Sequence, residues 1–515
     1  QFSIDNVSVK QVDPNDRWVL ETGWTFGDNG ASHNGIAGAI YQTNSSIING
    51  KTYKLSLTVS NVTSGTLTPF IAGTNSNLSI SQNGSYSVIV VAGSGARSID
   101  MYSNASFIGT ISNISVVEVQ GDRPRLSYDI TNGVVEDKPH LLLEPSATNL
   151  VTFSEDFSQS YWTKSDTTIN VNQSTSPDGN INADSIVSST ANSAHYLRHT
   201  FVAVSANTPH TYSFFIKANG YTKFGVRDNA QTGAYLTYDL ETESIINSAS
   251  MTVVVNKLKD DWFKCSFTST IGSNGVAGYA FYLLDNSYTT GYLNTYSYTG
   301  DGVSGFYIYG FQLEQQSYAT SYIPTAGTTI TRAAETCNNS KPSVNSTEGV
   351  LYAEIASLTT EGTGATRLSV NDGSQDNNVT IGYSASNTVR IIIRSSSSNQ
   401  ALITSTQTIT DFLKIAVKYK ANDFALYING SLIGTDTSGS APSGMNDVSF
   451  DKGDGTLDWY GKVKGLAVYN EALSESQLMQ LTGVTASSIY NNFVTRTASF
   501  TVEALNEVKK VIDNL

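Results

Sequence analysis

Cysteine and histidine are scarce in this chain of 515 residues, which contains two cysteines and five histidines. Cys265 lies in the alternating stretch Trp-Phe-Lys-Cys-Ser-Phe, which is typical of a strand, and Cys337 lies in a polar linker. A buried Cys265 would act as a small apolar side chain. We therefore expect no disulfide framework, and packed sheets must supply the stability.

The motifs that usually carry catalysis are missing as well. No histidine belongs to a His-Glu-x-x-His motif, and there is neither a Gly-x-Ser-x-Gly elbow nor a Walker loop. The adjacent carboxylates Glu155/Asp156 and Asp260/Asp261 are interpreted as turn residues, because the two carboxyls of a glycosidase must face each other across a cleft. The sequence predicts a non-enzymatic protein that requires no cofactor.

Charge is sparse, and its balance is negative. Charged residues make up 14% of the chain, and the net charge is −14. A nucleic-acid partner is disfavoured, because a binder must neutralise phosphates with clustered Lys and Arg. No apolar run approaches the roughly 20 residues that span a bilayer, so no membrane insertion is expected.

The chain is instead rich in Ser, Thr, Asn, Gly, Val, Ile and Tyr, the composition of an all-β protein with polar turns. Short stretches such as Thr52–Val59, Trp262–Ser269 and Ile415–Tyr419 alternate with period two. Asn-Gly pairs such as Asn83-Gly84 and Asn429-Gly430 favour tight turns between strands. The pattern predicts tandem antiparallel β-sandwiches.

A repeat suggests how the sandwiches follow one another. Residues 4–12 (IDNVSVKQV) recur as residues 111–119 (ISNISVVEV), where they would close a module. We therefore predict six segments. They are the closing strand of a preceding, absent module (1–12), a first jelly-roll-like module (13–120), a proline-containing connector (121–150), a second such module (151–335), a third sandwich (336–485) and a helical segment (486–515).

Two helices are expected near the C-terminus. Ser474 and Gln477 have capping-box spacing, which predicts a short helix. A second apolar stripe follows at three- and four-residue steps, formed by Leu505, Val508, Ile512 and Leu515. A helix this short is marginal alone in water. It must pack on its own domain or on symmetry mates, and we favour a homo-oligomer, specifically a trimer.

Aromatic side chains are the candidates for sugar binding, because sugars stack their C–H faces on exposed rings. Eight tyrosines crowd residues 279–309, and the turn-rich part holds Tyr288, Tyr292 and Tyr296. Trp459 and Tyr460 follow an acidic loop. The alternative is that the tyrosines only cover the two faces of a sheet.

That acidic loop is the candidate metal site. Asp451, Asp454 and Asp458 lie among glycines, and carboxylate oxygens on a flexible loop suit Ca²⁺. The spacing differs from the EF-hand pattern, and Asp-Gly pairs are also common in turns. Ca²⁺ is therefore the one cofactor to test.

Residues 141–164 (LLLEPSATNLVTFSEDFS…YWTK) and 310–325 (GFQLEQQSYATSYIPT) resemble the opening and closing stretches of a module found in bacteriophage tail and other virion structural proteins. Residues 13–120 are similar to jelly rolls of the carbohydrate-binding-module type. Residues 345–482 are similar to concanavalin A-like (laminin-G-like) lectin sandwiches. The fold expected from this resemblance is two jelly-roll modules, then a concanavalin A-like sandwich, with a short C-terminal helix.

The resemblance implies a virion structural protein, such as a tail fibre or receptor-binding adhesin that contacts host surface glycans. Its partners would be other virion proteins and host cell-surface polysaccharide, and its location the virion. Two alternatives stay open. One is a secreted or surface bacterial carbohydrate-binding protein, such as the binding part of a polysaccharide-degrading enzyme. The other is a tail-spike depolymerase.

Overall fold

The computed structural model describes residues 18–27, 29–43, 47–118, 124–131, 133–199, 202–228, 233–270, 275–293, 295–337, 341–360 and 366–483. The chain divides into two compact units: unit 1 (Gln1–Gly121 and Ala147–Arg332) and unit 2 (Asp122–Ser146 and Ala333–Leu515). The predicted closing strand at residues 4–12 and the apolar stripe of Leu505, Val508, Ile512 and Leu515 lie outside the described residues.

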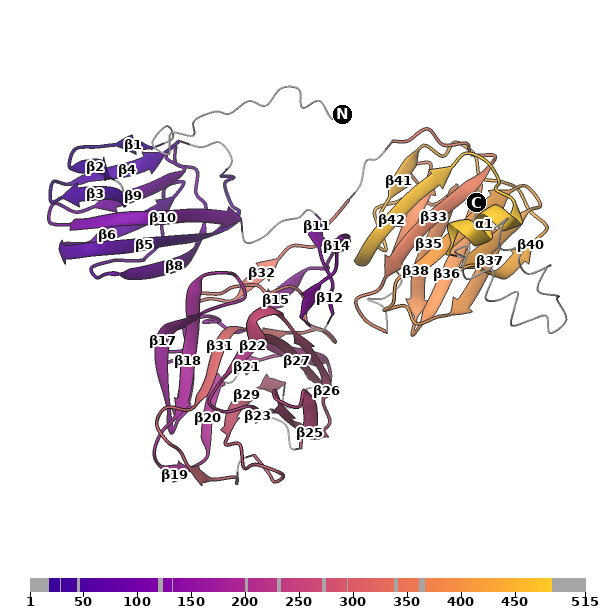
Figure 1. Cartoon of the computed structure of the whole chain (residues 1–515). Coiled ribbons are helices and arrows are strands. Elements are labelled where there is room, and N and C mark those ends of the chain that lie inside the picture. Colours follow the sequence, from indigo (N-terminus) through magenta and orange to yellow (C-terminus); the bar gives the residue numbers. More distant parts are fainter. Residues whose placement is uncertain are drawn as a thin grey trace, which may run out of the picture. The chain divides into compact units, whose positions relative to one another are not determined.

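The first sandwich of unit 1 consists of two five-stranded antiparallel sheets (Figure 1). Tyr53, Leu55, Leu57 and Val59 alternate with polar residues and point into its core. One sheet has the order β1 (Val19–Leu20), β4 (Gly38–Gln42), β9 (Ile99–Ser103), β6 (Leu67–Ile71), β7 (Thr74–Asn75). The other has the order β2 (Trp24–Gly27), β3 (Gly30–Asn34), β10 (Ile108–Glu118), β5 (Thr52–Ser64), β8 (Gly84–Val91).

The second sandwich, also in unit 1, has two six-stranded antiparallel sheets. Its core is aromatic: the Phe214 and Phe311 rings stack with centroids 4.6 Å apart. One sheet has the order β16 (Trp162–Ser165), β20 (His195–His199), β29 (Tyr279–Leu284), β23 (Lys223–Asp228), β24 (Tyr235–Asp239), β25 (Ser244–Ala249). The other has the order β17 (Thr167–Thr175), β18 (Ile181–Ser188), β31 (Gly305–Glu314), β22 (Pro209–Asn219), β27 (Phe263–Thr270), β26 (Thr252–Lys257).

Short elements complete the second sandwich. Three two-stranded pairs join β15 (Ala147–Asn149) to β32 (Ile330–Arg332), β19 (Asn192–Ser193) to β30 (Tyr298–Thr299), and β21 (Val202–Ala203) to β28 (Val276–Ala277). A 3₁₀ turn spans Lys259–Asp261. Because β15 and β32 pair, the chain enters and leaves this sandwich on adjacent strands.

Buried polar side chains hold the opening and closing stretches of the second sandwich together. Asn149 Nδ2 donates to the carbonyls of Phe311 (3.2 Å) and Ile323 (2.8 Å), and its Oδ1 accepts from the amides of Val151 (3.0 Å) and Leu313 (3.1 Å). Four backbone groups therefore depend on one amide. Asn149 and these partners belong to residues 141–164 and 310–325, which resemble a virion module. These two stretches therefore have a structural role in the second sandwich.

Unit 2 is a third sandwich, with sheets of seven and five strands (Figure 1). The larger has the order β11 (Arg125–Ser127), β14 (His140–Leu143), β42 (Gly461–Tyr469), β33 (Glu348–Ala356), β38 (Leu413–Lys420), β39 (Phe424–Ile428), β40 (Ser431–Asp436). The smaller has the order β37 (Ser398–Thr406), β36 (Thr388–Ser395), β35 (Asn378–Ala385), β34 (Thr366–Asn371), β41 (Asp447–Ser449). A hairpin pairs β12 (Ile130–Thr131) with β13 (Val134–Val135).

Residues 121–150, predicted as a connector, do more than connect. Leu141, Leu142 and Leu143 of β14 pair with β42, so this stretch adds two strands to the larger sheet of unit 2. The second sandwich is therefore inserted, in sequence, into the third. The three prolines that suggested a connector flank these short strands rather than interrupt them.

Ion pairs and hydrogen bonds among Arg125, Glu144 and Glu335 join the two points where the chain leaves and re-enters unit 2. Arg125 Nε donates to Glu335 Oε1 at 2.6 Å, and Arg125 Nη2 pairs with Glu144 Oε2 at 2.5 Å. The amide of Glu144 donates to Glu335 Oε2 at 2.7 Å. Both glutamates are buried, so the guanidinium neutralises charges that water does not reach.

The predicted tandem antiparallel sandwiches are confirmed. The capping-box prediction is confirmed too: α1 (Glu475–Leu481) begins after Ser474, whose amide donates to Gln477 Oε1 at 2.9 Å. Cys265 and Cys337 are free thiols. Within the described residues, no helix has the length and apolarity to span a membrane.

Candidate functional site

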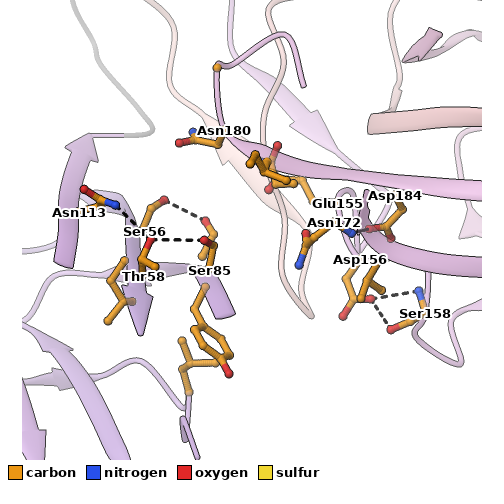
Figure 2. Close-up of a pocket in the computed structure, with 18 residues that line it drawn as sticks. Ser56, Thr58, Ser85, Asn113, Glu155, Asp156, Ser158, Asn172, Asn180 and Asp184 are labelled. Carbon is orange, nitrogen blue, oxygen red and sulfur yellow. Dashed lines mark hydrogen bonds between the residues drawn. The ribbon is translucent and has the colours of Figure 1, made fainter. Parts of the chain in front are cut away.

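A cavity of about 580 Å³ in unit 1 lies between the first and second sandwiches (Figure 2). We call it the junction cavity. Polar and apolar surface contribute about equally to its lining. It consists of Ser56, Leu57, Thr58, Leu78, Ser85, Tyr86, Ser87 and Asn113 from the first sandwich, and Glu155, Asp156, Ser158, Val171, Asn172, Gly179, Asn180, Ile181, Asn182 and Asp184 from the second.

The first wall is the outward face of β5 and β8. Ser56 pairs across the sheet with Ser87, and Thr58 with Ser85. Their hydroxyls lie 3.3 and 3.4 Å apart, respectively, and Asn113 Nδ2 donates to Thr58 Oγ1 at 3.4 Å (Figure 2). These residues alternate with the core residues of β5, so the strand period itself produces a surface of hydroxyl groups.

The second wall is a turn and a bulged strand that share one buried carboxylate. Asp184 Oδ1 accepts from the amide of Asn172 at 2.9 Å, and its Oδ2 accepts from the amide of Phe157 at 3.2 Å. Asn172 has φ 56° within the irregular part of β17, where Asn residues are tolerated. Asp184 thus fixes both the bulge and the turn that carries Glu155 and Asp156.

Burial raises the pKa of Asp184 to about 7, even though both backbone N–H bonds favour the charged form. The nearby charges of Asp156 and Glu155 act in the same direction as burial. Asp156 is satisfied separately: it accepts from the amide of Ser158 at 3.0 Å and from its hydroxyl at 2.5 Å (Figure 2). Asp184 and Asp156 therefore hold the backbone of this wall, whereas Glu155 accepts from side chains.

Lys54 joins the two walls. Its Nζ lies 3.1 Å from Glu155 Oε1 and 3.2 Å from Asp178 Oδ2, and the side chain is 16% exposed. Tyr309 OH donates to both carboxylates, at 3.1 and 2.9 Å. Burial works to lower the pKa of Lys54, but the charges of Glu155 and Asp178 outweigh it and the pKa is raised. The ammonium thus stays charged and links β5 to the second sandwich.

A second cavity of about 370 Å³ adjoins this ion cluster and shares Ser56 and Asn180 with the junction cavity. Lys54, Asp178, Tyr309 and other residues line it. Every charged side chain that lines the junction cavity itself is acidic: Glu155, Asp156 and Asp184. The junction cavity therefore suits neutral or cationic ligands with many hydroxyl groups.

The predicted tyrosine platform is only partly available. Tyr288 is 1% exposed and its hydroxyl donates to the Gly291 carbonyl at 2.8 Å, so the prediction that it binds sugar is wrong for this conformation. It packs with Tyr282 and Leu293 on the outer face of β29. Tyr296 stacks edge-on against Tyr288 with centroids 4.8 Å apart, and its hydroxyl donates to Asp285.

Tyr292 is the member of this group that remains accessible, at 72% exposure. Its ring lies 6.4 Å from that of Tyr235. Two neighbouring rings could contact a sugar, but the junction cavity offers far more hydrogen-bonding groups.

Trp459 is also a core residue and not a ligand-facing one. Its side chain is fully buried and packs against Tyr383 with ring centroids 5.1 Å apart, which contradicts the predicted glycan contact. Tyr460 is half-buried and donates to Asp458 Oδ2 at 3.2 Å. Burial and the charge of Asp458 raise the pKa of Tyr460 to about 12.

The acidic loop does not gather its three aspartates into a metal site. Across the described residues, no group of three or more His, Cys, Asp or Glu side chains is placed to hold a metal ion. Asp454 pairs with Lys452 at 3.2 Å, and Asp451 is buried and accepts from the amide of Gly453. The aspartates stabilise the loop that follows β41.

The junction cavity was not predicted, because its walls come from segments about a hundred residues apart. Glu155 and Asp156 were noted as turn residues, which is correct, but nothing local shows that their turn faces β5. The available signal was the run of small hydroxyl residues at the outward positions of β5 and β8.

Comparison with known proteins adds one family match. Residues 355–479, within unit 2, match the family described as the Concanavalin A-like lectin/glucanases superfamily. No curated protein sequence matches the chain. The similarity thus concerns the third sandwich.

Solved structures share low similarity with parts of the chain. The carbohydrate-binding module CBM40 of a Ruminococcus gnavus IT-sialidase has 17% identity and a TM-score of 0.24, and the match covers 29% of this chain and 97% of that one. Domains LG4-5 of mouse laminin alpha1 have 9% identity, a TM-score of 0.20, and 55% and 89% coverage. The CBM22-1-CBM22-2 tandem of Paenibacillus barcinonensis Xyn10C has 12% identity, a TM-score of 0.22, and 58% and 94% coverage. TM-scores this low do not define a shared fold for the whole chain.

Proposed function

We propose that this chain is a carbohydrate-binding protein that holds an uncharged or amine-bearing oligosaccharide in the junction cavity without cleaving it. The observation that carries the proposal is the lining itself: hydroxyls and amides on both walls, carboxylates on the second wall, and no Lys, Arg or His. Sugars present both donors and acceptors, so a wall of such groups matches them along their length. The volume of about 580 Å³ lies within the usual range for ligand sites.

Apolar surface completes the match. Leu57, Leu78, Val171 and Ile181 contribute to the lining, and the half-buried Tyr86 provides an aromatic ring. Tyr86 is fixed by a hydrogen bond from its hydroxyl to the Gln82 carbonyl at 2.8 Å. A sugar ring could place its C–H face on the exposed Val171 or Ile181 while its hydroxyls contact Asn172 or Asn180.

The test uses the full chain on a glycan array, followed by calorimetry with the best ligand. Ser85 is exposed on the first wall, so Ser85→Phe fills the cavity without disturbing the core. We expect Ser85→Phe to weaken binding at least tenfold. Ser248→Phe, at an exposed position of the edge strand β25, is the matched control and should bind normally. Full affinity in Ser85→Phe would contradict the proposal.

A second candidate function is glycoside hydrolysis in the same cavity. It is favoured by Asp184, because a carboxyl with a pKa of about 7 suits a general acid. Against it, each oxygen of Asp184 already accepts a backbone N–H bond, so this carboxyl has a structural role in holding Asn172 and Phe157. New reducing ends released from a bound polysaccharide, and lost in Asp184→Asn, would establish the hydrolytic function instead.

For the biological setting, we propose a virion appendage, such as a tail fibre or adhesin that contacts host polysaccharide. Support comes from the resemblance of residues 141–164 and 310–325 to virion modules and from the tandem sandwiches. A secreted or surface bacterial protein fits the same cavity. Mass spectrometry of purified phage particles that contains peptides of this chain would support the virion location, and its recovery from bacterial culture medium alone would favour the alternative.

Homo-trimerisation through residues 486–515 belongs to the same proposal. Sedimentation of the full chain should give a trimer, and removal of these residues should give a monomer. A monomer in both cases would eliminate it.

Calorimetry with Ca²⁺ tests the metal hypothesis: we expect no change in glycan affinity after chelation, since no cluster of three metal-ligating side chains occurs within the described residues.

A further inference from the structure

Three arginines share the outer face of the smaller sheet of unit 2, in a chain whose net charge is −14. Leu368 and Val370 of β34 face the core, as do Val389, Ile391 and Ile393 of β36. Arg367 of β34 and Arg390 and Arg394 of β36 alternate with them and therefore lie on the opposite face. Such a gathering of positive charge is unexpected in so acidic a protein.

Arg367 and Arg390 face each other across a glycine. Arg367 pairs with Gly382 in the sheet, and Gly382 pairs with Arg390. A Cβ at position 382 would lie 2.7 Å from Arg367 Nη1, so the guanidinium lies over Gly382, in the direction of Arg390. There Nη1 donates to the carbonyls of Thr366 and Tyr383, each at 2.7 Å. Because Gly382 has no side chain, the Arg367 guanidinium can lie over it, on the side of Arg390.

These arginines have neutral partners only. Among the described residues, none of the three has a carboxylate within ion-pair distance: Arg394 donates to Gln375 Oε1 (3.2 Å) and to the Ser397 carbonyl (2.6 Å). Arg390 Nε and Arg394 Nε are buried and have no hydrogen-bond partner. Arg367 is 2% exposed, and burial followed by the charge of Arg390 lowers its pKa to about 10. An anion bound beside Arg390 and Arg394 would offset the repulsion between these positive charges.

We infer that the half-buried Arg390 and Arg394 form a binding site for the carboxylate or sulfate groups of an acidic polysaccharide, with the buried Arg367 adding positive charge behind them. Arg390 and Arg394 are four residues apart on one strand, about 13 Å, so one extended polymer can reach both. Ile392 lies between them, half-buried, and offers apolar surface to a sugar ring. No aromatic side chain of β34–β37 shares this face, which disfavours single-stranded nucleic acid.

This site is independent of the junction cavity. It lies in unit 2 and selects anions, whereas the cavity lies in unit 1 and has an acidic lining. The chain would therefore bind two chemically different sugars, and either proposal can fail while the other stands.

The experiment measures binding of the full chain to polygalacturonate (carboxylate) and dextran sulfate (sulfate) at 0.15 M salt, with uncharged dextran and single-stranded DNA as further probes. We expect binding to at least one of the two acidic polymers, and at least a tenfold loss in Arg390→Gln/Arg394→Gln. Arg390→Lys keeps the positive charge but loses the planar pair of N–H donors of the guanidinium. It should therefore retain part of the affinity. Lys420→Gln, which removes an exposed charge paired with Glu348 elsewhere in unit 2, should bind normally.

Several results would overturn the inference. They are no binding to either acidic polymer, equal binding to uncharged dextran, tighter binding to DNA, or the same loss in Lys420→Gln as in the arginine variants. Circular dichroism and melting of each variant ensure that a loss of binding comes from a folded chain, and Arg390→Lys provides a second variant if the double change unfolds unit 2.

Discussion

At the scale of single residues, Lys54 has the largest consequence for the site. It is one side chain of the first sandwich surrounded by groups of the second: Glu155, Asp178 and the Tyr309 hydroxyl. The Lys54 ammonium neutralises Glu155 and Asp178. Its removal leaves these two carboxylates close together without a counter-charge.

We therefore predict that Lys54→Met destabilises the contact between the two sandwiches by on the order of 2 kcal/mol. Glycan affinity should fall at least tenfold and the radius of gyration from X-ray scattering should rise, while the circular dichroism stays that of folded sheets. Lys51→Met removes a more exposed pair with Glu118 on the same sandwich and should change neither quantity. An unchanged radius and affinity in Lys54→Met would show that Lys54 does not hold the walls.

Asp184 predicts a pH dependence. Its pKa is raised from the ordinary value to about 7, so between about pH 4 and pH 7 the folded state holds a proton that the unfolded state releases. The stability due to this group is thus present at low pH and is lost as the pH rises toward 7, by up to roughly 4 kcal/mol in total. Above pH 7 the curve should level off.

The measurement is urea unfolding of the second sandwich, followed by tryptophan fluorescence at pH 5 and pH 7, for the parent and Asp184→Asn. The parent should lose more stability over this range than Asp184→Asn, which stays neutral. Asp301 is the control, because hydrogen bonds from Ser304 and Val303 outweigh its small burial and lower its pKa. Asp301→Asn should give only a small effect of opposite sign. Parallel curves for the parent and Asp184→Asn would contradict the assignment.

At the scale of elements, the opening and closing strands of the second sandwich depend on one amide. Asn149 is fully buried and satisfies four backbone groups from three separate stretches. Each buried group left without a partner costs about 1–3 kcal/mol. Asn149→Ala should therefore lower the free energy of unfolding of this sandwich by at least about 3 kcal/mol.

Chemical denaturation checks this prediction, with Thr148→Ala as the control. Thr148 lies beside Asn149 but only shares an exposed hydroxyl contact with Thr331, so its loss should cost about 0.5 kcal/mol or less. A similar small cost in Asn149→Ala would mean that water replaces the amide.

The elements also mark where sequence reasoning succeeded. Alternation over Thr52–Val59 and Ile415–Tyr419 predicted β5 and β38, and the Ser474/Gln477 spacing predicted α1, because these signals are local. β14 was missed, because its partner β42 lies more than three hundred residues away and its prolines resemble those of a linker. A four-residue strand carries too little local pattern to identify its neighbour.

At the scale of the whole molecule, the chain consists of two units, and one sandwich is inserted into another in sequence. The candidate site was beyond sequence reasoning for the same reason. Whether a ring such as Tyr288 or Trp459 is a ligand or a core residue depends on what covers it, and the covering segment is not its neighbour in sequence. Tyr292 and the residues that line the junction cavity differ from Tyr288 and Trp459 in being accessible once the chain is folded.

The two proposed sites, which lie in separate units and would bind sugars of different charge, suit adhesion by many weak contacts. Linking binding sites raises overall affinity without new chemistry, provided that both can engage one surface. The acidic junction cavity and the arginine face of unit 2 would then address neutral and acidic parts of a mixed polysaccharide.

The most direct test of the central claim is a crystal structure of the full chain soaked with its best neutral oligosaccharide. We predict sugar density in the junction cavity, with hydroxyls bonded to groups of both walls, such as Ser85 and Asn180. Sugar bound elsewhere, for example on the exposed ring of Tyr292, with none in the cavity, would contradict the account.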